Sequence, residues 1–173
     1  MERAWRPLWE EAPVQASEHP LVHDLVPTVS VADLRQSDVF VQGMTIGRGL
    51  PVVGDICMGS AIHANGTPYT GRGWSAASSD GKAIERLTQQ KHNNYPELLA
   101  SDRVRFVTLA CEEGGRWGPD VFAVVQDLVR LKVAPLHPLL RRSAALAFSR
   151  RWWSILGKAR CLENLDLLTG GGE

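Results

Sequence analysis

Apolar and polar residues alternate early in the chain in a way that predicts two neighbouring strands. In the segment 38–41, Asp38 and Phe40 fall on one face of a strand and two valines fall on the other. A second run, 50–58, is apolar and rich in valine. The glycines of the segment 43–49, which lies between the two runs, suit a hairpin. We therefore expect two strands joined by a tight connection.

A helical period follows a long stretch of small residues. Residues 59–80 are small and polar with several glycines, which is typical of a long loop. Over 81–100, apolar side chains recur at steps of three and four, with Pro96 as a break. The face that they share consists of Ile84, Leu87, Lys91, Tyr95 and Leu98. Lys91 therefore stands in the middle of an apolar stripe.

Three further elements complete the pattern and set the fold class. Alternation predicts a third strand over 103–111, Pro119 opens a helix, and a last helix runs from about 139 to 158. The order strand, strand, helix, strand, helix, helix is that of an α/β protein. We expect an N-terminal arm over 1–19, a single domain over 20–160 and a flexible C-terminal tail over 161–173.

Composition agrees with one folded domain. The chain has 173 residues, of which 44% are hydrophobic and 22% charged, as in an ordinary globular protein. No apolar stretch approaches the roughly 20 residues that span a bilayer, and the first residues lack an apolar signal core. Cys57, Cys111 and Cys161 are too scattered for a disulfide framework or a zinc site, so we expect reduced thiols in an intracellular protein.

The net charge is zero, but the charges are unevenly distributed. Residues 1–33 hold six acids against two bases, and residues 130–160 hold eight bases and no acid. The last predicted helix carries Arg141, Arg142, Arg150 and Arg151. Such a helix is suited to a polyanion such as DNA, and the alternative is a solvated helix face.

Asp38, Asp55 and Lys91 are charges in places where burial is expected and costly. Each has an ordinary explanation. Asp38 could bond nearby backbone in a turn, Asp55 could pair with an arginine, and Lys91 could extend along its aliphatic stem to water. Together, two carboxylates on neighbouring strands suit one hard cation, and a lysine nearby suits a phosphate. This combination predicts metal-assisted phosphodiester hydrolysis.

The segments around these residues resemble a known nuclease pattern. The segments are Arg35 to Val41, Val53 to Ile56, Ala83 to Tyr95 and Phe106 to Gly115. They resemble the restriction-like endonuclease domain at the C-terminal end of non-LTR retrotransposon polyproteins, which belongs to the PD-(D/E)XK nuclease superfamily. The resemblance covers about residues 20–157, with Ser37 in place of the usual proline and Cys57 where lysine is usual.

The resemblance implies a restriction-endonuclease-like α/β fold in which helices flank a central mixed sheet. It implies that Asp38 and Asp55 bind Mg²⁺ or Mn²⁺ and that Lys91 is the catalytic lysine. Tyr95 and Glu112 would support this site, although Glu112 could instead cap a helix or face water. The implied activity is metal-dependent nicking of DNA by a nuclear protein of retroelement origin. A reverse transcriptase or another element-encoded polypeptide is the implied protein partner.

Two other functions fit the same sequence. A catalytically inactive remnant would keep the fold and the basic helix and bind nucleic acid without cleaving it. A protein-interaction module would use tryptophans such as Trp5, Trp9 and Trp153 as anchors, because tryptophan is enriched in binding hot spots.

Overall fold

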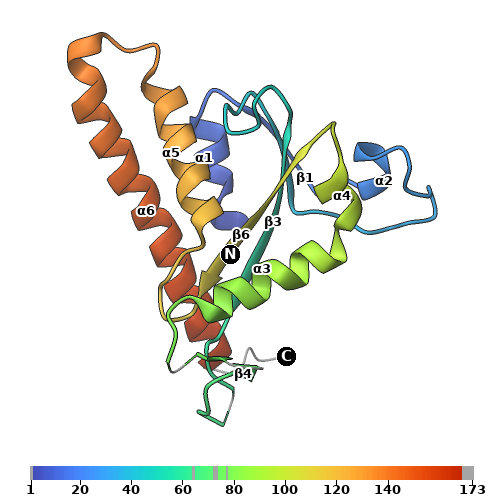
Figure 1. Cartoon of the computed structure of the whole chain (residues 1–173). Coiled ribbons are helices and arrows are strands. Elements are labelled where there is room, and N and C mark those ends of the chain that lie inside the picture. The colour runs from blue at the N-terminus through green and yellow to red at the C-terminus, as the bar shows by residue number, and fades with distance from the viewer. Residues whose placement is uncertain (1, 64, 72–73, 77, 169–173) are drawn as a thin grey trace.

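The alternating segments form a four-stranded mixed sheet in the order β1-β2-β3-β6. β1 (Gln15–Glu18), β2 (Val39–Gln42) and β3 (Val52–Gly59) pair antiparallel, and β6 (Arg105–Glu112) pairs parallel with β3 (Figure 1). The computed structural model describes residues 2–63, 65–71, 74–76 and 78–168. The predicted α/β class and the mixed sheet flanked by helices are confirmed.

The predicted hairpin of β2 and β3 is present, and Gly54 allows the two strands to pack closely. Val39 lies opposite Gly54, and Phe40 lies opposite Val53. A Cβ atom added to Gly54 would lie 2.8 Å from the Val39 Cγ1 atom. Glycine at position 54 therefore leaves room for the Val39 side chain on the opposite strand.

The N-terminal segment, expected to be an arm, is part of the sheet and the core. The short 3-10 helix η1 (Glu2–Ala4) and helix α1 (Arg6–Glu11) bury Trp5 and Leu8 almost completely. β1 then pairs along the outer edge of β2. Its four residues are all exposed, so the segment shows no apolar alternation from which a strand could be predicted.

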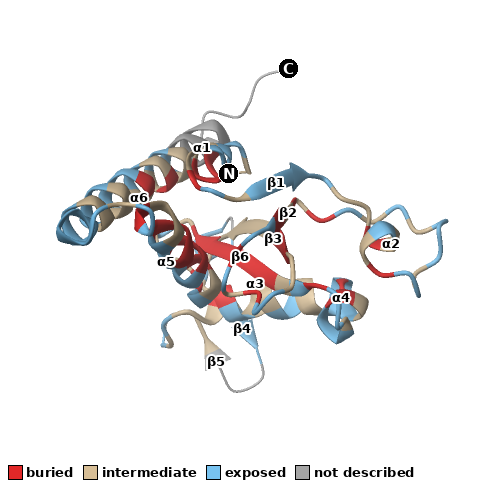
Figure 2. Cartoon of the chain, turned by 90° about the horizontal axis from the view of Figure 1, so that it is seen from above, coloured by how far each residue is buried: buried red, intermediate tan, exposed pale blue. Residues whose placement is uncertain are grey.

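One face of the sheet packs on a helical layer made of α1, α5 (Pro119–Val133) and α6 (Pro138–Leu168) (Figure 2). Trp152 and Leu156 of α6 are fully buried there. Helix α6 continues to Leu168, beyond its expected end near Lys158, and residues 169–173 of the expected tail lie outside the described residues. Within the part that the structure describes, no helix combines the length and apolar character needed to cross a bilayer.

The other face of the sheet packs on α3 (Lys82–Asn94) and α4 (Pro96–Ala100), with α2 (Val22–Leu25) beside them. Pro96 divides the two helices as predicted, because its ring cannot continue the hydrogen bonding of α3. The long loop before α3 contains a small hairpin of β4 (Thr70–Gly71) and β5 (Trp74–Ser75).

Candidate functional site

Asp38 and Asp55 lie opposite each other at the end of the β2–β3 ladder. Val39 is paired with Gly54, so one further step of the same register places Asp38 across from Asp55. The Asp38 backbone N–H donates to the Gly54 carbonyl at 3.1 Å, and the Ile56 N–H donates to Asp38 Oδ2 at 2.5 Å. Directly opposed residues on antiparallel strands have Cβ atoms about 5 Å apart. The two carboxylates therefore share the sheet face that α3 covers.

Lys91 reaches this pair from α3. Its Nζ atom lies 2.5 Å from Asp55 Oδ2, and the Asp55 side chain is only 3% exposed whereas that of Lys91 is 23% exposed. Ile84 and Leu87 on the same helix face are buried, so the predicted stripe is confirmed with Lys91 as its one charged member. The Lys91 ammonium pairs with a buried carboxylate instead of extending to water. The partner of Asp55 is this lysine rather than an arginine.

Tyr95, four residues after Lys91, adds a second contact to Asp55. Its hydroxyl donates to the Gln36 carbonyl at 2.7 Å and lies 3.3 Å from Asp55 Oδ1. Tyr95 is itself buried, and burial together with the charge of Asp55 raises the pKa of its phenol to about 12. The hydroxyl therefore stays protonated at neutral pH and acts as a hydrogen-bond donor.

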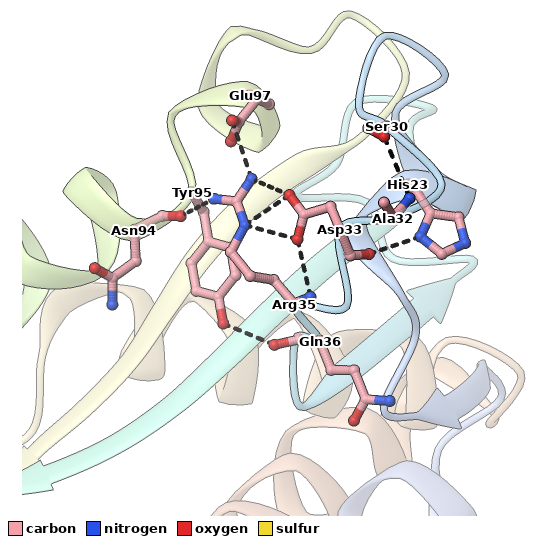
Figure 3. A network of polar contacts seen from close by, with 9 residues as sticks. All are labelled: His23, Ser30, Ala32, Asp33, Arg35, Gln36, Asn94, Tyr95 and Glu97. Atoms are coloured by element: carbon pink, nitrogen blue, oxygen red, sulfur yellow. Dashed lines mark hydrogen bonds and ion pairs between the residues drawn. The ribbon is translucent and has the colours of Figure 1, made fainter.

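A polar network fixes the segment that leads into Asp38 (Figure 3). The Arg35 guanidinium lies 2.6 Å from Asp33 Oδ2 and 3.0 Å from Glu97 Oε1. It also donates to the Asn94 carbonyl at the end of α3. Arg35 thus ties the chain before β2 to the junction of α3 and α4, which is where Tyr95 lies. The network fixes the position of the segment before Asp38 relative to Tyr95.

The electrostatics show two carboxylates competing for one ammonium. Burial raises the pKa of Asp55, with a further contribution from the charge of Asp38, while Lys91 opposes the rise. Burial also raises the pKa of Asp38, which the Ile56 N–H opposes. Burial alone would lower the pKa of Lys91, but its contact with Asp55 outweighs this and raises it. Lys91 is therefore charged at neutral pH.

Glu2 and His19 lie beside Asp38 and were not predicted. One ligand atom from each of these three residues lies within 4.8 Å of the other two, and the His19 Nε2–Glu2 Oε1 distance is 3.2 Å. The His19 N–H donates to the Asp38 carbonyl, and His19 has a left-handed backbone with φ of 54°. The sequence gives no signal for this grouping, because it depends on η1 and β1 folding back onto β2.

A buried hydroxyl without a partner stands on the other side of Asp55. Thr108 lies opposite Asp55 in the β3–β6 register and is 2% exposed. Its Oγ1 atom has no hydrogen-bond partner among the described residues. Unpaired buried hydroxyls are costly and uncommon in folded proteins. Among the described residues, the ligand atoms that lie close together are those of Glu2, His19 and Asp38, and Thr108 stands on the far side of Asp55 from them. The oxygens of Glu2 and Asp38 are of the kind that a hard divalent cation takes.

Glu112, expected to support the site, lies outside it. In the parallel register it is opposite Gly59, four residues beyond the Asp55–Thr108 pair, or about 13 Å along the strand. It is 8% exposed, so it does not face water, and its backbone N–H donates to the Arg116 carbonyl. The predicted acid at the strand end therefore exists but is too far along β6 to share the site.

The four arginines of α6 are also far from the two aspartates. Helix α6 packs on the sheet face opposite to α3 (Figures 1 and 2). Arg151 pairs with Glu11 at 2.5 Å, and the Arg141 Nε–H donates to the Leu136 carbonyl at 3.0 Å. Arg142 and Arg150 are exposed. The structure brings together Asp38, Asp55, Lys91 and Tyr95, and it does not bring the α6 arginines to them.

A scan against models of known protein families finds no match for this chain, and no curated protein matches it either. The functional argument therefore rests on the arrangement of these side chains.

Proposed function

We propose that the protein is a divalent-metal-dependent endonuclease that nicks DNA, with a restriction-endonuclease-like fold of the kind found in non-LTR retrotransposons. The observation that carries the proposal is the juxtaposition of Asp38 with Asp55 and the 2.5 Å contact of Lys91 with Asp55. Opposed acids on a hairpin and a lysine from the next helix are the groups that the resemblance implies. Asp38, Asp55 and Lys91 all lie between the sheet and α3.

Position 57 departs from the superfamily pattern. Cys57 stands two residues after Asp55, on the same face of β3, where lysine is usual in the superfamily. Burial raises the pKa of the Cys57 thiol to about 12, with the nearby Lys91 opposing the rise. The thiol is thus neutral and lies within electrostatic reach of the Lys91 ammonium. Lys91 supplies from α3 the positive charge that Cys57 cannot supply from the strand.

The proposal gives each residue of the site a role in this reaction. Asp38 and Asp55 would hold Mg²⁺ or Mn²⁺, with Glu2 and His19 as further ligands on the Asp38 side. When bound, such a cation lowers the pKa of water and neutralises phosphate charge. Lys91, charged at neutral pH, stabilises the negative charge that develops on the phosphate oxygens rather than acting as a base. Tyr95 keeps Asp55 oriented through its hydroxyl.

Plasmid nicking with Mg²⁺ or Mn²⁺ tests the proposal. Asp55→Asn keeps the shape of the side chain and removes its charge, so it should abolish nicking while circular dichroism stays unchanged. Asp102→Asn is the matched control, because Asp102 is an exposed aspartate in the turn before β6. Nicking that persists in Asp55→Asn, or that is lost equally in Asp102→Asn, would contradict the assignment.

A further inference from the structure

Thr108 places a hydroxyl where the fold alone would accept an apolar side chain. Figure 2 shows β6 buried along this part of its length, and Thr108 is 2% exposed. Ala110, the next residue on the same face of the strand, packs against α3. The Thr108 hydroxyl has no hydrogen-bond partner among the described residues. Valine has the same shape and favours strands, so the fold gains nothing from this hydroxyl and bears the cost of burying it.

The polar group beside Thr108 on this face is the Asp55 carboxylate. The two residues are partners in the parallel β3–β6 register, and neighbouring strands lie about 4.8 Å apart. Their side chains leave the sheet on the same side, toward α3. A change of side-chain torsion is therefore enough to bring the hydroxyl and the carboxylate into hydrogen-bond distance.

In this structure Asp55 is held by two other groups. Lys91 Nζ lies 2.5 Å from Oδ2, and the Tyr95 hydroxyl lies 3.3 Å from Oδ1. The closer acceptor of the Tyr95 hydroxyl is the Gln36 carbonyl, at 2.7 Å. In the proposed reaction the Lys91 ammonium stabilises charge on the phosphate, so it no longer holds Asp55. The carboxylate, whose side chain is 3% exposed, then keeps only the long contact with Tyr95.

We propose that Thr108 is a positioning residue for Asp55, an inference that rests on the proposed endonuclease function. Its hydroxyl donates to the Asp55 carboxylate when Lys91 turns from Asp55 to the phosphate. Carboxylates that bind a metal are themselves held by hydrogen bonds from neighbouring groups, and a buried carboxylate without donors is costly. The hydroxyl is thus unpaired while Lys91 holds Asp55 and paired when Lys91 releases it.

The backbone of Thr108 does not explain the hydroxyl. The Thr108 N–H donates to Asp120 Oδ2 at 3.0 Å, which anchors β6 to the start of α5. This bond uses the main chain alone, so valine at position 108 would keep it. The role of the side-chain oxygen can therefore be tested without disturbing the contact between the strand and the helix.

The stability of Thr108→Val in two backgrounds tests the inference without any nuclease assay. With Lys91 in place, we expect Thr108→Val to leave the urea midpoint unchanged or to raise it, because an unpaired buried hydroxyl is removed. In Lys91→Met the hydroxyl is the donor that remains for Asp55, so the same substitution should lower the midpoint. Thr70→Val, at an exposed position of β4, is the matched control and should behave alike in both backgrounds.

Mn²⁺ binding and nicking give the second measurement. Thr108→Val should weaken Mn²⁺ binding in calorimetry and slow nicking by roughly tenfold or more, the usual effect of one hydrogen bond to a charged group. The acid limb of its nicking profile should move to higher pH, because a donor to the carboxylate favours the charged form of Asp55. Thr108→Ser keeps the hydroxyl and should restore Mn²⁺ binding, rate and pH profile.

The outcomes separate this inference from the proposed activity. The same effect of Thr108→Val in both backgrounds, or Mn²⁺ binding that Thr108→Ser does not restore, would overturn the role of Thr108. Where Lys91→Met does not fold, the Mn²⁺ affinities of Thr108→Val and Thr108→Ser decide. If the stability effect reverses between backgrounds but the unmodified protein does not nick plasmid, the endonuclease fails and Thr108 still supports Asp55. If Thr108→Val nicks at the unmodified rate and pH, the role of Thr108 fails and the endonuclease stands.

Discussion

Lys91 Nζ lies 2.5 Å from Asp55 Oδ2, across the interface between α3 and the central strand β3. The aspartate is almost fully buried, so its charge depends on this one ammonium and on the more distant Tyr95 hydroxyl. A buried pair of this kind is weak evidence for a purely stabilising role, because desolvation of the two ions offsets most of their attraction. A nearby second carboxylate, Asp38, makes the pair still less favourable unless it has another purpose.

The first prediction concerns the coupling of Lys91 and Asp55. Lys91→Met leaves the Asp55 carboxylate buried without its cation, and we expect the free energy of unfolding to fall by about 3–5 kcal/mol. In the Asp55→Asn background, the same replacement should cost much less, because no buried charge remains to be neutralised. Urea denaturation of the two single variants and the double variant measures this coupling. Costs that simply add would show that the two groups do not interact.

The second prediction concerns pH and follows from the raised pKa of Asp38. In the folded state this carboxyl has a pKa above its ordinary value of 3.8, mainly because it is buried. Between the two values the folded protein binds more protons than the unfolded chain, so stability falls as pH rises through the folded pKa. Asp38→Asn removes this penalty and keeps an oxygen for the Ile56 N–H.

Asp38→Asn should therefore be more stable than the unmodified protein at neutral pH in EDTA. The difference should shrink as the pH is lowered below 3.8, where Asp38 is protonated in both states. Thermal unfolding at a series of pH values measures it. A variant that is less stable at neutral pH, or a difference that does not depend on pH, would contradict the raised pKa. Asp38→Asn should also lose nicking activity. The Asp38 carboxylate would then be needed for the reaction although it lowers the stability of the fold.

The third prediction concerns metal binding. A ligand that binds only the folded state at about one hundred times its Kd stabilises it by about 2.7 kcal/mol. Mn²⁺ or Mg²⁺ should therefore raise the melting temperature of the unmodified protein. The rise should be nearly lost in Asp55→Asn and reduced in Glu2→Gln, because Glu2 offers a ligand atom on the Asp38 side. Asp102→Asn should respond as the unmodified protein does. An equal rise in Asp55→Asn would place the cation elsewhere.

The sequence predicted the centre of the site because charged residues stand there inside apolar patterns. Lys91 is conspicuous within the stripe of α3, and Asp55 is conspicuous among the valines of β3, so their meeting could be expected. Glu2 and His19 could not be expected, since an exposed edge strand such as β1 leaves no alternation. Local patterns identify faces of elements, and they do not identify which distant elements fold onto those faces.

Glu112 and the α6 arginines show the same limit, because sequence patterns predicted roles for them and the structure places them far from the two aspartates. Alternation places Glu112 on the same face of the sheet as Asp55, but only the parallel register shows that the two are four residues apart along the strands. The count of bases in residues 130–160 identifies a basic helix, but it cannot show that α6 packs on the face opposite to α3. Both facts are set by tertiary packing.

The last prediction concerns the glycine that lets the two aspartates meet. A Cβ atom at position 54 would lie 2.8 Å from Val39 Cγ1 and 3.3 Å from Leu109 Cδ1, both in the packed core. Gly54→Ala should therefore cost about 1–3 kcal/mol, the usual range for overpacking. Gly114→Ala, at a position with no atom within 4 Å of the added Cβ, is the matched control and should be nearly neutral.

Gly54→Ala should also reduce metal-dependent nicking by more than its loss of stability explains. The clash is relieved if β2 moves away from β3 or if the Val39 side chain turns, and the Asp38–Asp55 pair comes directly after the Val39–Gly54 pair in the register. We expect the strands to move, because valine has few alternative rotamers. Nicking measured at a temperature where the variant is fully folded distinguishes the two effects. Full activity in the folded variant would show that the spacing of the two carboxylates is not critical to the reaction.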